Sequence, residues 1–118
     1  MERGRTYRDR PLSDFLDFAE RAVAAINSAI GAVPRERVRL HVCYGNWEGP
    51  HIHDIPLVKI LPALYQANVS ALSIEFSNPR HAHEWTVWHE NKVPDDLVLI
   101  PGCLDSTTNF VEHPELIA

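Results

Sequence analysis

Residues 38–44 read VRLHVCY, and this stretch decides the fold because apolar and polar side chains alternate along it. A period of two is typical of a β-strand that buries one face and leaves the other uncovered. His41 and Cys43 are two positions apart, so they leave the strand on the same face. The apolar set on the opposite face consists of Val38, Leu40, Val42 and Tyr44.

Outward from this strand, apolar runs and helical periodicities alternate along the chain. Residues 69–76 and 97–100 are predicted to form two further strands. The predicted helices cover residues 13–33, with Ser13 as the N-cap, and residues 57–66, 81–91 and 112–118. Strands that alternate with helices of this length predict right-handed crossovers and a parallel sheet. The predicted fold class is therefore α/β, built from parallel βα units.

The chain of 118 residues is expected to form one domain over residues 1–118, with residues 1–12 as a flexible N-terminus. Three parallel strands are few for a complete domain, because a parallel sheet is normally covered on both faces and at its edges. We therefore expect either a small open sandwich or a part of a larger structure.

The composition argues against several function classes. Eleven basic and sixteen acidic residues give a formal net charge of -5, whereas nucleic acid binding needs a basic face. No segment reaches the roughly 20 apolar residues that cross a bilayer, and the N-terminus lacks the apolar core of a signal peptide. Two cysteines do not make a disulfide framework, so we predict a cytoplasmic protein. From the charge and from the lack of a long apolar segment, we expect no nucleic acid partner and no membrane partner.

Glu75 lies near the carboxyl end of the second predicted strand, on a face that it shares with Ala71 and Ser73. Parallel α/β folds bind their ligands at the carboxyl ends of the strands. If the first two strands are neighbours, about 4.8 Å apart, the side chains of His41, Cys43 and Glu75 converge. Nitrogen, sulfur and oxygen donors in one cluster suit zinc, so these three residues are the predicted metal ligands.

The same residues also allow a purely structural interpretation. In that interpretation Cys43 is a buried small hydrophobic residue and His41 is a hydrogen-bonded core histidine. Glu75 argues against it, because an unpaired carboxylate inside a fold is costly.

Two histidine pairs, His51 with His53 and His81 with His83, are further candidates for metal binding. The alternative is that these histidines support other residues or lie on the surface. A metal hydrolase that uses His51 and His53 is accordingly a third and weaker hypothesis.

The loops that follow the strands carry the predicted substrate contacts. Asn46 and Glu48 follow the first strand, a position in which substrate contacts are usual. Arg80 follows the second strand, and its guanidinium can bind a carboxylate or sulfonate through two hydrogen bonds. Asp105 follows the third strand and is the predicted catalytic residue, either as a hydrogen-bond acceptor beside the metal or as a substrate contact.

Residues 41–46, HVCYGN, resemble the catalytic domain of the cobalamin-independent methionine synthase family. The other matching residues are Glu75, Asn78-Pro79-Arg80-His81, Glu84-Trp85, Pro101-Gly102 and Asp105. The resemblance covers residues from about Asn27 to Ala118. The sequence resembles the shorter members of the family, which include epoxyalkane:coenzyme M transferase, more closely than it resembles methionine synthase itself. It implies about three of the eight strands of a (β/α)8 TIM barrel, with zinc held by the residues that match His41, Cys43 and Glu75.

The resemblance also implies a reaction between a small-molecule thiol and an alkyl donor. Zinc holds the thiol as a thiolate, which attacks a methyl or epoxide carbon. The family's fourth ligand, a cysteine, is expected on a strand beyond this sequence, and Cys103 does not match it. Where methionine synthase has a catalytic histidine, residues 106–108 read STT, which favours the shorter relatives.

The principal hypothesis is therefore a zinc-dependent thiol alkyltransferase or methyltransferase, or a fragment of one. The alternative is a non-catalytic binding or assembly module that closes a barrel with partner chains. An arc of three strands leaves two edges and half of an interior uncovered. We therefore expect a homo-oligomer, or a partner that supplies the missing strands.

Overall fold

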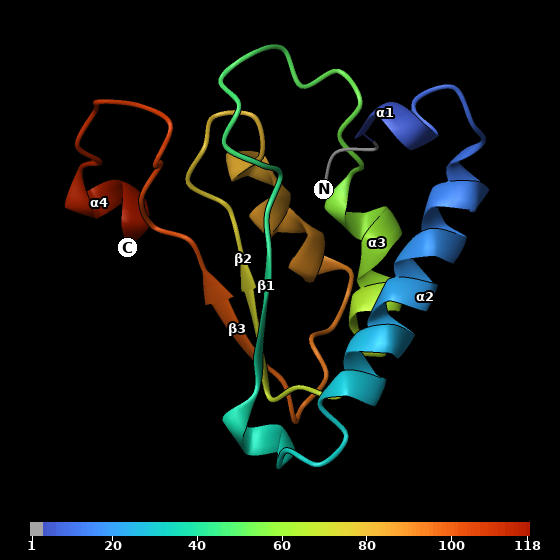
Figure 1. Ribbon diagram of the computed structural model, residues 1–118. Coiled ribbons are helices and arrows are strands. Elements are labelled where there is room, and N and C mark those ends of the chain that lie inside the picture. Colours follow the sequence, from blue (N-terminus) through green and yellow to red (C-terminus); the bar gives the residue numbers. More distant parts are fainter. Residues whose placement is uncertain (1–3) are drawn as a thin grey trace.

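A three-stranded parallel sheet in the order β1-β2-β3 forms the centre of the computed structural model, which describes residues 4–118. Its strands are β1 (Arg39–Val42), β2 (Ala71–Ile74) and β3 (Val98–Pro101). Figure 1 shows the carboxyl ends of all three strands at one edge of the sheet, each followed by a loop. The predicted parallel βα arrangement is confirmed, although β1 and β2 are shorter than their apolar patterns and β3 begins one residue later than predicted.

The two longest α-helices, α2 (Leu12–Ala29) and α3 (Leu57–Leu64), pack against each other beside the sheet (Figure 1). The apolar stripe of residues 13–33 therefore predicted a helix correctly. The prediction of Ser13 as its N-cap is wrong, because Pro11 holds that position and no side chain caps the helix. Proline suits this position, since its missing N–H is not needed before the first helical turn.

The segment predicted as a helix over residues 81–91 forms a 3₁₀-helix, η2 (Ala82–His89). Side chains three apart lie above one another in a 3₁₀-helix, and here every third residue points inward. His81 and Glu84 are buried, and Val87 packs against the core. The remaining elements are α1 (Gly4–Tyr7), η1 (Arg35–Arg37) and α4 (Pro114–Ile117).

The N-terminal segment that the sequence predicted to be flexible contains α1. The ring of Tyr7 at its end packs edge-on against the ring of Phe15, with 5.8 Å between the ring centroids. Residues 1–3 lie outside the described residues. None of the helices within residues 4–118 combines the length and the apolar composition needed to cross a membrane.

The two faces of the sheet differ in what covers them. One face is buried against the helices and contributes Val42, Leu72 and Ile74 to the core. The opposite face carries His41 and Cys43, both exposed, and Val98, which is 60% exposed. We call this second surface the open face; it consists of Arg39, His41, Cys43, Ala71, Ser73, Glu75, Val98 and Ile100.

Asn27 joins α2 to the segment that leads into β2. Its side chain donates to the Gln66 carbonyl at 2.8 Å and accepts from the Asn68 N–H at 2.7 Å.

We expect Asn27→Ala to lower the free energy of unfolding by about 1–2 kcal/mol, because two backbone groups lose their partner. Urea denaturation followed by circular dichroism measures this. The exposed Asn109→Ala is the control, and an equal loss in both variants would contradict the expectation.

Candidate active site

The three predicted metal ligands lie on the open face, near the carboxyl edge of the sheet. His41 lies within β1, Cys43 comes directly after β1, and Glu75 directly follows β2. The Glu75 N–H donates to the Val42 carbonyl at 3.2 Å, which keeps the two strand ends side by side. His41 and Cys43 are both exposed, so the interpretation of Cys43 as a buried hydrophobic residue is wrong.

A small cleft opens where the loops after β1, β2 and β3 meet. Its lining includes five of the predicted site residues, namely Cys43, Asn46, Glu75, Arg80 and Asp105. The other lining residues are Gly45, Asn78, Ser106 and Thr107. The structure therefore brings together a thiol, two carboxylates, a guanidinium and several amides and hydroxyls from three loops.

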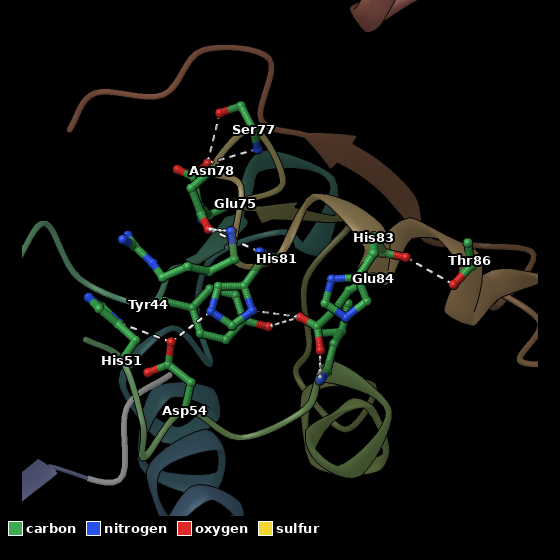
Figure 2. A network of polar contacts seen from close by, with 12 residues as sticks. Tyr44, His51, Asp54, Glu75, Ser77, Asn78, His81, His83, Glu84 and Thr86 are labelled. Carbon is green, nitrogen blue, oxygen red and sulfur yellow. Dashed lines mark hydrogen bonds and ion pairs between the residues drawn. The ribbon is translucent and has the colours of Figure 1, made fainter. Parts of the chain in front are cut away.

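The two carboxylates of the cleft are held by short local hydrogen bonds. Glu75 accepts from the hydroxyl of Ser77 at 2.8 Å and from its N–H at 3.0 Å (Figure 2). Asp105 accepts from the hydroxyl of Thr107 at 2.7 Å and from its N–H at 2.9 Å. The Thr107 hydroxyl, with a smaller effect from the charge of Arg80, lowers the pKa of Asp105 below its ordinary value. Asp105 is therefore ionised at neutral pH.

Two predicted site residues do not line the cleft. His41 is on the same face as Cys43, but its Nδ1 lies 3.3 Å from the Ser73 hydroxyl. Glu48 is exposed in the loop of residues 45–56. The substrate role predicted for Glu48 therefore has no support from its position.

The donor types of the open face suit zinc, but a complete ligand cluster is not formed. Imidazole, thiol and carboxylate are the groups that zinc binds in proteins. Within residues 4–118, no group of three or more histidine, cysteine, aspartate or glutamate side chains is arranged to hold a metal ion. Cys43 and Glu75 already share the cleft, so His41 is the donor that would have to turn toward them.

In each of the two histidine pairs, one side chain is buried and the other is more accessible. The side chains of His51 and His81 are buried, 2% and 8% exposed, whereas His53 is half-buried and His83 is exposed. Neither pair therefore presents two imidazoles to one site.

His51 and His81 instead belong to a buried network of polar contacts (Figure 2). We call it the buried network; its members are Tyr44, His51, Asp54, His81 and Glu84. The His81 ring stacks on the Tyr44 ring, with 3.3 Å between centroids and 4° between planes. Sequence reasoning missed this network: the three-residue spacing of His81 and Glu84 fits one side of a 3₁₀-helix, but it does not identify Tyr44 or Asp54 as their partners.

Glu84 is the central acceptor of the buried network. Its Oε2 accepts from the Tyr44 hydroxyl at 2.5 Å and contacts His81 Nδ1 at 3.1 Å. Its Oε1 accepts from the Leu57 N–H, the first residue of α3, at 2.7 Å. Burial, together with the hydrogen bond and the charge of Glu84, raises the pKa of Tyr44 far above its ordinary value. The Tyr44 phenol therefore remains a donor at physiological pH.

Gly45 lets the chain turn sharply between Cys43 and the loop of residues 45–56. Its φ of 88° lies in the left-handed region, which a side chain would strain. Cys43 and Tyr44 both precede this turn; Cys43 is exposed and lines the cleft, whereas Tyr44 is buried and belongs to the buried network.

The chain is similar to the 2-hydroxypropyl-CoM lyase of Xanthobacter autotrophicus (strain ATCC BAA-1158 / Py2). The identity is 25% over 127 aligned residues, which cover 86% of this chain. The chain spans about a third of that relative's length, since the aligned part is 34% of it. No family model matches the chain, and no solved structure matches it.

Proposed function

We propose that this chain carries part of the active site of a zinc-dependent thiol alkyltransferase or methyltransferase, in which His41, Cys43 and Glu75 hold the metal. The observation that carries the proposal is the meeting of Cys43, Glu75 and three predicted substrate or catalytic residues in one cleft. The similarity to 2-hydroxypropyl-CoM lyase supports it, because that name describes an enzyme acting on a thioether. Zinc at this site would hold a substrate thiol as its thiolate at neutral pH.

The other residues of the cleft suit the two substrates of such a reaction. Arg80 offers a guanidinium that can hold the anionic end of a small thiol or its alkyl donor. Asp105 is ionised, so it can accept a hydrogen bond from a substrate N–H or O–H group. The Asn46 side chain supplies both a donor and an acceptor beside Cys43.

The proposed architecture is part of a (β/α)8 barrel of the cobalamin-independent methionine synthase family. In such a barrel the helices pack outside and the opposite face of the sheet lines the interior. The open face, which carries His41, Cys43 and Glu75, corresponds to that interior.

Assembly with further strands is the second candidate function, and the exposed Val98 on the open face favours it. In a three-stranded sheet, β1 and β3 each have an edge with no partner strand in the described residues. Copies of this chain, or a partner chain, would cover these edges. Light scattering of the purified chain tests assembly from copies of this chain: a stable oligomer supports it, and a well-folded monomer contradicts it and leaves only a partner chain.

Thioether formation tests the catalytic proposal directly. We expect the chain with one equivalent of zinc, a small thiol and an epoxide to form thioether faster than the metal-free chain, by about tenfold or more. Mass spectrometry of the product measures the rate. Arg80→Gln is expected to raise the KM for an anionic thiol more than for a neutral one. A zinc-loaded chain that forms thioether no faster than the metal-free chain would contradict the proposal.

A further inference from the structure

All four ring nitrogens of the two buried histidines lie against acceptor oxygens. His81 Nδ1 contacts Glu84 at 3.1 Å, and His81 Nε2 contacts Asp54 Oδ2 at 2.7 Å. His51 Nδ1 contacts the same Asp54 oxygen at 2.9 Å, and His51 Nε2 contacts the Trp47 carbonyl at 2.5 Å. A neutral imidazole has one N–H, so neither ring can make both of its hydrogen bonds in that form.

The proton count of the buried network follows from these contacts. Five contacts join its side chains to each other and to the Trp47 carbonyl, and each hydrogen bond needs one proton. With ionised carboxylates and neutral imidazoles, only three protons are present: one each on Tyr44, His51 and His81. The complete network therefore needs two protons more, carried by the rings or shared with the carboxylates.

The surroundings of Asp54 agree with this count. Its Oδ1 is buried and has no hydrogen-bond partner in the described part of the chain. A buried carboxylate without compensation is costly, and positive rings or a shared proton reduce that cost. The groups that face His81 are Tyr44 from the end of β1, Asp54 from the loop and Glu84 from η2; α3 contributes the N–H of Leu57 to Glu84.

We propose that the buried network is a proton-dependent latch and that His81 is its positioning residue. The latch joins the loop of residues 45–56, through His51 and Asp54, to the segment that follows β2, through His81 and Glu84. Other residues of these two segments, Gly45 and Asn46 of the loop and Asn78 and Arg80 after β2, line the cleft that contains Cys43 and Glu75, together with residues 105–107 after β3. The two additional protons complete the hydrogen bonds between the two segments, and their loss allows the loop of residues 45–56 to open. The effect on zinc binding rests on the proposed function, whereas the latch itself does not.

The sign of the pH dependence follows from the proton count. The closed latch binds more protons than the open loop, so its stability is full at low pH and is lost as pH rises. Each proton released on opening raises the opening equilibrium constant tenfold per pH unit. Two protons therefore give a rise of up to about 100-fold per pH unit.

Hydrogen exchange of the metal-free chain tests the latch. Peptides that cover residues 45–57 are followed by mass spectrometry from pH 6 to pH 9, and the intrinsic pH dependence of exchange is divided out. We expect the opening constant to rise by more than tenfold per pH unit over part of this range. In His81→Gln the rise is expected to be no more than tenfold, because one proton-binding ring is gone.

His83→Gln is the matched control, since His83 lies exposed on the same 3₁₀-helix and outside the network. It should keep the pH dependence of the unmodified chain. If His81→Gln does not fold, His51→Gln makes the same comparison from the other end of the network. An opening constant that is independent of pH in the unmodified chain, or an unchanged slope in the folded glutamine variant, would overturn the latch.

Zinc affinity gives a second readout that separates the latch from the proposed function. We expect His81→Gln to weaken zinc binding about tenfold relative to His83→Gln, because a loop that opens more often leaves the cleft with Cys43 and Glu75 formed for a smaller fraction of the time. Equal affinities in the two variants would overturn the positioning role of His81 even where the pH slope holds. Absence of zinc binding in the unmodified chain would overturn the proposed function and leave the latch intact.

Discussion

Glu84→Ala is expected to lower the free energy of unfolding by about 3–5 kcal/mol, among the largest effects of any single substitution in this chain. The carboxylate accepts hydrogen bonds from the Tyr44 hydroxyl, the Leu57 N–H and the His81 ring. Glu84 is buried, so alanine leaves these donors without water or protein acceptors. The expected loss of stability has two causes. The Tyr44 hydroxyl and the Leu57 N–H lose their acceptor, and the His81 ring loses the negative charge beside it.

Urea denaturation at pH 7, followed by circular dichroism, measures the loss. Glu84→Gln should lose less than the alanine variant, because an amide oxygen still accepts from one of the donors. Glu90→Ala is the matched control, since Glu90 is exposed and follows the same 3₁₀-helix; we expect a change within about 0.5 kcal/mol. A Glu84→Ala chain as stable as the Glu90 variant would show that the buried network contributes nothing to folding.

Alternation along residues 38–44 was sufficient to predict the faces of β1. A period of two assigns each side chain to one face, whatever the neighbouring strands do. The burial of Val42 and the exposure of Cys43 follow from it. Strand lengths were less predictable, because pairing with a neighbour, and not the apolar pattern, decides where a ladder ends.

The cleft was predictable in part because of strand direction. Parallel strands carry their carboxyl ends to one edge, so Asn46, Arg80 and Asp105 were expected near Cys43 from topology alone. His41 shows the limit of that reasoning. The alternation of side chains along β1 predicts the face on which His41 lies. The rotamer that turns the His41 ring to Ser73 depends on neighbouring side chains that the sequence does not specify.

The buried network lay beyond sequence reasoning for a different reason. Tyr44 and Glu84 are 40 residues apart, and Asp54 and His81 are 27 apart. In the alternating pattern Tyr44 counts as an apolar residue of the core face, and its hydroxyl gives no periodic signal. Only the three-dimensional arrangement of η2 against the loop identifies the partner of that hydroxyl.

Cys43→Ser is expected to weaken metal binding by more than about 100-fold if Cys43 is a ligand. Loss of a supporting residue near a metal costs 10- to 100-fold in affinity, and loss of a ligand costs more. Cobalt(II) is a suitable probe, because a thiolate bound to cobalt gives a charge-transfer absorption that a serine cannot give. Titration of the metal-free chain with cobalt(II), and zinc competition against it, measure both the ligand and the affinity.

Cys103→Ser is the matched control for this substitution. Cys103 is the other exposed cysteine and follows β3, but it does not line the cleft with Cys43. Its replacement should leave the thiolate absorption and the zinc affinity unchanged, since the Cys103 Sγ contacts only the Pro101 carbonyl among the contacts described. If the absorption persists in Cys43→Ser and disappears in Cys103→Ser, the metal is bound after β3 and the proposed ligand set is wrong. If it disappears only in Cys43→Ser, the thiol at the end of β1 holds the metal, as the proposed transfer reaction requires.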